Sequence, residues 1–138
     1  MTVIDASAVV DLLLPREDGP HALLLAEVPE PASPWLAPDV LIFEVFAVVR
    51  RQLLRRLVLP HEAGRALRRL PRLPIDLVPA VGLLQAAWSL RDRLSAADSL
   101  YAALALQAAE PLLTTDLRLA RAARSAGVEA RTPDRGNT

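Results

Sequence analysis

Short apolar runs alternate along the chain with longer segments in which apolar residues recur at helical spacing. The short runs are β-branched or leucine-rich, which predicts buried strands over 1–4, 35–37, 75–78, 112–114 and 128–130. The longer segments predict helices over 7–14, 18–28, 39–56, 60–70, 79–93, 96–109 and 116–126. This alternation predicts an α/β fold with a short, mainly parallel sheet of roughly four to five strands between two helical layers.

Local signals refine several of these boundaries. Ser7 and Ser95 stand where an N-cap is needed, and Gly127 follows a helix as a C′ residue does. The chain of 138 residues is the size of a single domain, which we place at 1–131, followed by a polar tail at 132–138.

Composition removes several kinds of chemistry. The sequence has no cysteine and no lysine, which excludes disulfides, thiolate nucleophiles, Schiff-base chemistry and a P-loop lysine. No apolar stretch reaches the roughly 20 residues of a membrane span, and the N-terminus lacks the basic region of a signal peptide. We therefore expect a cytoplasmic protein without a membrane segment.

The formal net charge of zero hides a separation of charge. The window 50–72 holds eight arginines and one acid, Glu62, whereas the rest of the chain holds eight arginines and fifteen acids. Such a basic window could face phosphate groups, or it could be a solvated helix surface whose arginine stems cover apolar residues.

Four carboxylates stand in apolar surroundings. Asp5 ends the first strand, and Asp116 follows the strand at 112–114. Glu44 is the sole charge in the segment 40–49, which is apolar on every face and is therefore expected to be buried, and Asp98 is the sole charge in 94–109. A buried carboxylate is costly unless it is protonated, paired or bound to a metal.

The predicted fold places two of these acids at one edge of the sheet. Asp5 and Asp116 lie at the carboxyl ends of parallel strands, where ligand sites of such sheets are found. Four carboxylates close together would repel one another, and a divalent cation removes that conflict. Ligands with oxygen donors alone favour Mg²⁺ or Mn²⁺ over zinc.

Four blocks of sequence resemble the PIN-domain ribonucleases and, among them, the VapC toxins of bacterial toxin–antitoxin pairs. The blocks are VIDASAVVDLLL, EVFAVVRR, LSAADSLYAALALQ and PLLTTDLRLARAARSAGV, and they span nearly the whole chain. The resemblance implies a PIN-like three-layer α/β/α sandwich.

The resemblance also implies roles for individual residues. Asp5, Glu44, Asp98 and Asp116 would be the acidic quartet that holds Mg²⁺ or Mn²⁺, with Ser7 and Thr114 as supporting hydroxyls. The family commonly has asparagine three residues after the helical glutamate, where this chain has Ala47, a departure that concerns the groups around the quartet.

The implied activity is endonucleolytic hydrolysis of RNA by water, leaving a 5′-phosphate, with a VapB-like antitoxin as partner. Apolar side chains over 40–59 suggest a homodimer face. Tyr101 and Trp35 could stack on a base, although Tyr101 also has the spacing of a core residue. Arginines that could contact the RNA backbone are Arg65, Arg68, Arg69, Arg118, Arg121 and Arg124.

Three alternatives bear on these interpretations. A catalytically silent PIN-like module that binds RNA or protein is supported by Ala47. A phospho-accepting receiver domain also clusters acids around Mg²⁺, but its chemistry needs a lysine. A halo-acid-type phosphatase would have aspartate at position 7, where Ser7 stands.

Overall fold

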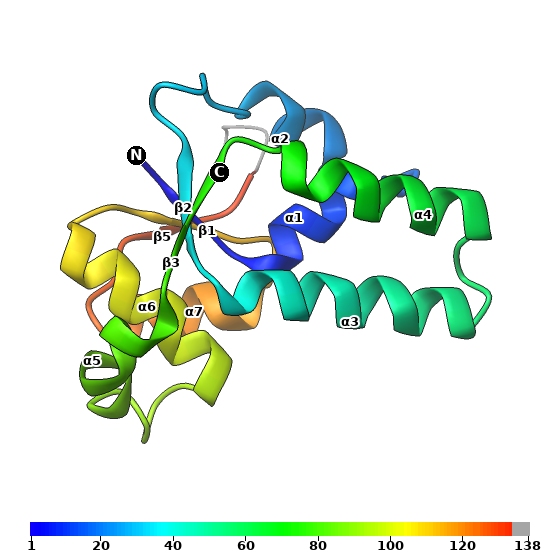
Figure 1. The fold of residues 1–138 in the computed structure, drawn as a ribbon. Helices are drawn as coiled ribbons and strands as arrows, with labels where there is room; N and C mark the ends of the chain where they lie inside the picture. Colours follow the sequence, from blue (N-terminus) through cyan, green and yellow to red (C-terminus); the bar gives the residue numbers. More distant parts are fainter. Residues whose placement is uncertain (134–138) are drawn as a thin grey trace.

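The computed structural model describes residues 1–133 and has a five-stranded sheet at its centre (Figure 1). The strands lie in the order β3-β2-β1-β4-β5, and every pairing is parallel. Their bounds are β1 (Val3–Ile4), β2 (Trp35–Pro38), β3 (Ile75–Val78), β4 (Leu112–Leu113) and β5 (Ala130–Arg131). The predicted α/β architecture is confirmed.

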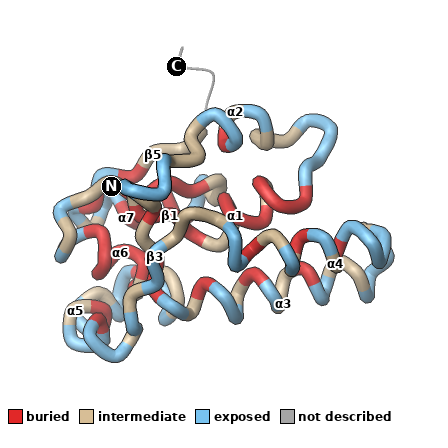
Figure 2. The backbone as a smooth tube through the Cα atoms, turned by 45° about the horizontal axis from the view of Figure 1, so that its top comes forward, coloured by how far each residue is buried: buried red, intermediate tan, exposed pale blue. Residues whose placement is uncertain are grey.

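Seven α-helices connect and cover these strands in the described part of the chain. They are α1 (Ala6–Leu13), α2 (His21–Ala26), α3 (Val40–Leu54), α4 (Pro60–Arg69), α5 (Leu84–Trp88), α6 (Ala96–Ala108) and α7 (Leu117–Ser125). Two 3₁₀ turns, Leu70–Arg72 and Ala80–Leu83, complete the set. Helix α1 buries five of its eight residues and α6 six of its thirteen, and Figure 2 shows these buried stretches in red.

Several predicted boundaries were wrong for local reasons. The helix expected at 18–28 begins only at His21, because the residues before it form a turn. In this turn the amide of Gly19 donates a hydrogen bond to the carbonyl of Arg16. The helix expected at 79–93 is a 3₁₀ turn followed by α5, which ends at Trp88. Beyond it, the Trp88 carbonyl accepts hydrogen bonds from both the backbone amide and the side chain of Arg91, in place of the amide four residues on that would continue the α-helix. The last strand lies at Ala130–Arg131 rather than at 128–130.

The expectation that 40–49 is buried on every face was also wrong. Helices α3 and α4 form an antiparallel pair that extends to one side of the sheet (Figure 1). Leu41, Val45 and Val49 face the core, whereas Phe43 is 69% exposed and Phe46 is 49% exposed. An apolar helix face therefore remains uncovered in the single chain.

Other findings concern the ends of the chain and membrane insertion. Of the tail predicted at 132–138, the structure describes Thr132 and Pro133, and the rest lies outside the described residues. Within residues 1–133, no helix combines the length and apolar character needed to cross a bilayer.

Candidate active site

Two predicted site residues lie at the same carboxyl edge of the sheet because β1 and β4 are neighbours. Asp5 directly follows β1 and caps α1, accepting a hydrogen bond from the amide of Ala8 at 3.2 Å. Asp116 follows β4 and caps α7, accepting from the amides of Arg118 and Leu119. Both carboxylates are thus fixed by helix N-termini, where negative charge is favourable.

Ser7 was predicted as the N-cap of the first helix, and the structure corrects this. The cap is Asp5, and Ser7 lies inside the helix with its Oγ 2.8 Å from Oδ1 of Asp5. The same Oγ lies 3.1 Å from Oγ1 of Thr114 and accepts from the amide of Thr115. The two hydroxyls therefore link the edges of β1 and β4 and orient the Asp5 carboxylate.

Asp5 is the most deeply buried carboxylate of this group, with 5% of its surface exposed. Burial raises the pKa of Asp5 to about 6, although the hydrogen bonds from Ser7, Ala8 and Thr114 favour its charged form. A metal-free Asp5 is accordingly protonated at mildly acidic pH.

Glu44 projects from α3 to the hydroxyl of Tyr101, which donates a 2.6 Å hydrogen bond to Oε1. Burial raises the pKa of Glu44, and the charge of Asp98 adds to this effect, while the Tyr101 bond opposes it. The buried phenol in turn has a pKa raised by desolvation and by the Glu44 carboxylate, so it remains a donor. Tyr101 therefore positions Glu44.

The suggested stacking of a base on Tyr101 or Trp35 is wrong. Tyr101 is 1% exposed and Trp35 is 2% exposed, so neither ring face is accessible. One feature of the sequence could have indicated the role of Tyr101. Glu44 has no polar neighbour in the segment 40–49, so its partner had to come from another element.

Asp98 and Asp116 are joined by the guanidinium of Arg118. Its Nη2 lies 3.1 Å from Oδ2 of Asp98 and 3.3 Å from Oδ2 of Asp116. The hydrogen bond to Asp98 and the two carboxylate charges raise the pKa of Arg118. Arg118 was predicted as an RNA contact, and its pairing with both acids was missed.

The oxygen donors at this edge fit a divalent cation in their chemistry. Carboxylates and hydroxyls are the groups that Mg²⁺ and Mn²⁺ prefer, and the Arg118 guanidinium marks a place where positive charge is stabilised. Within residues 1–133, no three carboxylate or imidazole side chains are close enough to form a preassembled ligand cluster. To hold an ion, the carboxylates would have to approach one another.

The other arginines predicted to contact RNA lie on two different helices and differ in exposure. Arg65 and Arg68 are exposed on α4, where Arg69 is half-buried, and Arg121 is exposed on α7. Arg124 is exposed as well, and its guanidinium donates two hydrogen bonds to the carbonyl of Ala130, which ties α7 to β5.

Comparison with known proteins shows which family the chain belongs to. The family model described as PIN domain matches residues 2–125. Ribonuclease VapC9 of Mycobacterium tuberculosis is 36% identical over 119 residues, covering 86% of this chain and 88% of the relative. Ribonucleases VapC1 and VapC3 of the same species are 38% and 39% identical, covering 87% of this chain and 89% and 85% of their own lengths. The chain therefore belongs to the PIN-domain family and, within it, to the VapC group.

Proposed function

We propose that this protein is a Mg²⁺- or Mn²⁺-dependent endoribonuclease that acts as the toxin of a toxin–antitoxin pair. The observation that supports the proposal is that Asp5 and Asp116 lie at the carboxyl edge of the sheet, while Arg118 joins Asp116 to Asp98 and the charge of Asp98 acts on Glu44. Relatives over most of the chain are named ribonucleases, which supports RNA as the substrate.

Each residue has a distinct part in the proposed reaction. Asp5, Glu44, Asp98 and Asp116 would hold the metal ion, which supplies activation of water and neutralises charge at the scissile phosphate. Ser7 and Thr114 keep the Asp5 carboxylate in one orientation, and Tyr101 does the same for Glu44. Water attacks phosphorus, the bond to the 3′-oxygen breaks, and the products carry a 3′-hydroxyl and a 5′-phosphate.

The test is cleavage of total cellular RNA by purified protein, with the new ends mapped. We expect cleavage with Mg²⁺ or Mn²⁺, loss of cleavage with EDTA and recovery when metal is restored. The same assay examines the catalytically silent alternative, which Ala47 favours: RNA left intact in every metal while still bound would support a binding module instead.

The basic surface of α4 is proposed to contact the RNA backbone. Replacing Arg65, Arg68 and Arg69 together by glutamine should weaken RNA binding. It should also reduce the slope of log affinity against log salt by about 2, since each phosphate contact on a single strand contributes roughly 0.7. Fluorescence anisotropy over a range of salt concentrations measures this, and an unchanged slope would assign these arginines to a solvated helix face.

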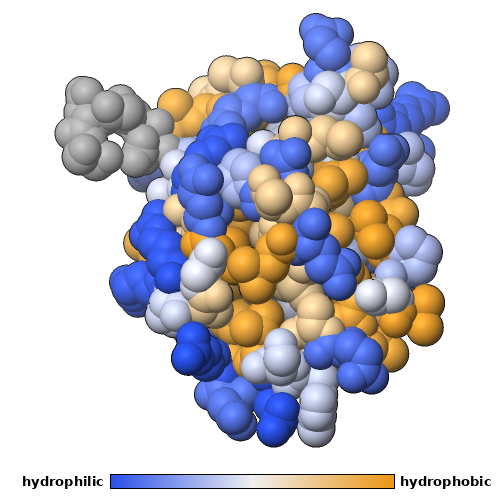
Figure 3. Space-filling model, turned by 90° about the vertical axis from the view of Figure 1, so that its left-hand side faces the viewer, coloured by the Kyte–Doolittle hydropathy of each residue, from blue (hydrophilic) through white to orange (hydrophobic). Residues whose placement is uncertain are grey.

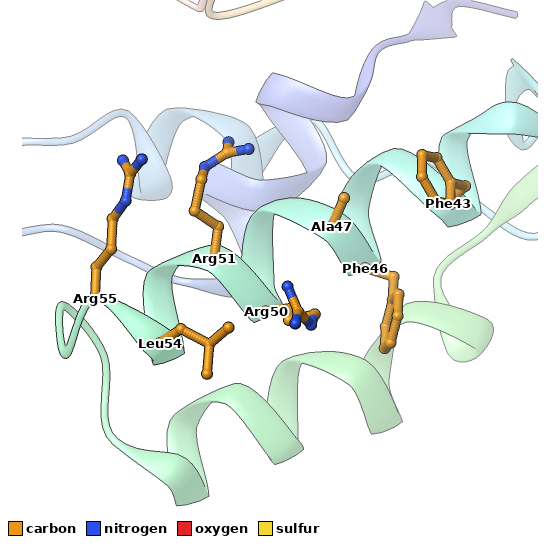
Figure 4. A pocket seen from close by; sticks show the side chains of 7 residues that line it. All are labelled: Phe43, Phe46, Ala47, Arg50, Arg51, Leu54 and Arg55. Atoms are coloured by element: carbon orange, nitrogen blue, oxygen red, sulfur yellow. The ribbon is translucent and has the colours of Figure 1, made fainter.

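A homodimer is proposed through the uncovered face of α3. Phe43, Phe46 and Leu54 are exposed along it, and Figure 4 shows them beside arginines of the same helix. The side of the molecule that carries α5 also has apolar side chains, but in Figure 3 polar groups divide them into separate clusters.

Sedimentation velocity at tens of micromolar tests the dimer. We expect a dimer for the wild type and a monomer for the double variant Phe43→Asn, Phe46→Asn, because both rings would lose their burial against the partner. Trp88→Asn, which changes an aromatic residue 64% exposed on α5, is the matched control and should remain dimeric. A monomeric wild type would contradict the proposal.

The antitoxin is proposed to place an apolar helix against α1, α2 and the start of α3 and an arginine at the acidic edge. The pairing of Arg118 with two carboxylates supports this, since it demonstrates that these oxygens accept a guanidinium. We also propose a cytoplasmic location, where RNA and antitoxin are both present. Co-expression with the product of an adjacent small gene should suppress RNA cleavage and toxicity.

A further inference from the structure

Arg118 occupies the carboxylate oxygens that the proposed metal ion would need. Its Nη2 contacts Oδ2 of Asp98 from α6 and Oδ2 of Asp116 from the start of α7. Oδ1 of Asp116 is already committed to backbone amides, so Oδ2 is the oxygen that faces Arg118. Among residues 1–133, Arg118 is the side chain that donates a hydrogen bond to the Asp98 carboxylate.

The position of Arg118 makes this contact easy to release. Its side chain is 65% exposed, and solvent-exposed ion pairs contribute little to stability. Arg118 also lies in the first turn of α7, where the positive end of the helix dipole disfavours a cation. The two carboxylates hold it there against that field.

From this geometry we infer that Arg118 is a displaceable internal counter-ion of the active site, an inference that rests on the proposed metal-dependent function. In the metal-free protein it screens the repulsion between Asp98 and Asp116. A divalent cation that takes the same oxygens displaces it. The released guanidinium, whose planar fork matches a phosphate, then binds the RNA backbone next to the site. Metal binding and RNA binding are thereby coupled through one side chain.

The first test is the affinity for Mn²⁺ alone, measured by calorimetry on the full chain. Arg118→Gln should bind Mn²⁺ about three- to tenfold more tightly than the wild type, because competition and repulsion by the guanidinium are removed. Arg121→Gln removes a charge one turn along α7 without touching either carboxylate, so it is the matched control and should bind Mn²⁺ like the wild type.

The second test compares the binding of a short single-stranded RNA in EDTA and in Ca²⁺, another ion with oxygen ligands. Arg118→Gln should weaken RNA binding severalfold in Ca²⁺ and leave it nearly unchanged in EDTA, where the wild-type guanidinium is held by Asp98 and Asp116. A purely structural Arg118 would produce the same change in both conditions.

The outcomes separate this inference from the proposed function. Equal or weaker Mn²⁺ affinity in Arg118→Gln, or an equal loss of RNA affinity with and without Ca²⁺, overturns the counter-ion role while metal-dependent cleavage stands. A wild-type protein that binds no Mn²⁺ and cleaves no RNA overturns both.

Discussion

Asp98→Asn is expected to lower RNA cleavage by more than about 100-fold, since loss of groups that merely orient metal ligands already costs about 10–100-fold. The Asp98 side chain is 14% exposed, and in the wild type its charge raises the pKa of Glu44 and pairs with Arg118. The substitution removes that charge. An amide oxygen retains the shape of the side chain and loses the charge that would hold a divalent cation. Rates measured on RNA at saturating Mg²⁺ give the result.

The same variant should remain folded, which separates a site effect from a structural one. In EDTA its free energy of unfolding should equal or exceed that of the wild type. Relief of repulsion on Glu44 offsets the loss of the ion pair with Arg118, because solvent-exposed ion pairs contribute little to stability. Asp76→Asn, on an exposed position of β3, is the control and should keep full activity. Cleavage by Asp98→Asn at the wild-type rate would remove Asp98 from the site.

The sheet and the place of Asp5 and Asp116 could be predicted because both depend on local sequence. Continuous apolar runs indicate strands buried on both faces, and a polar residue at the end of such a run lies at the carboxyl edge. The bond between Glu44 and Tyr101 could not be predicted in this way, since it joins two helices 57 positions apart and depends on how they pack.

Competition between neighbouring groups explains other differences. Asp5 and Ser7 are both good caps, and spacing alone did not decide at which of them the helix begins; in the structure Asp5 is the cap and accepts from the amide of Ala8. The apolar sequence of α3 indicates a buried helix, yet part of its surface is exposed in the single chain. We propose that a second copy of the chain covers this surface. The pairing of Arg118 with Asp98 likewise required the position of α6 relative to α7.

Asp5→Asn is expected to stabilise the metal-free protein at pH 7.5 while abolishing cleavage. Burial raises the pKa of Asp5 from 3.8 to about 6, so the folded protein binds this proton more tightly than the unfolded chain does. The free energy of unfolding therefore falls as pH rises from about 4 to about 6, and it stays lower above that range. A shift of this size corresponds to about 3 kcal/mol, which sets the upper limit of the gain.

The pH dependence distinguishes this cause from a general improvement in packing. Asparagine is as good an N-cap as aspartate and can still accept a hydrogen bond from Ser7 or Ala8, so α1 should remain capped. Urea unfolding in EDTA should show the variant more stable at pH 7.5, with less than half of that difference left at pH 4.5, where the wild-type Asp5 is protonated. Because acidification titrates other carboxylates equally in both proteins, the difference between them isolates position 5. A gain that is the same at both pH values would show that the charge of Asp5 does not destabilise the metal-free fold, so that its burial gives no energetic reason for a cation at this position.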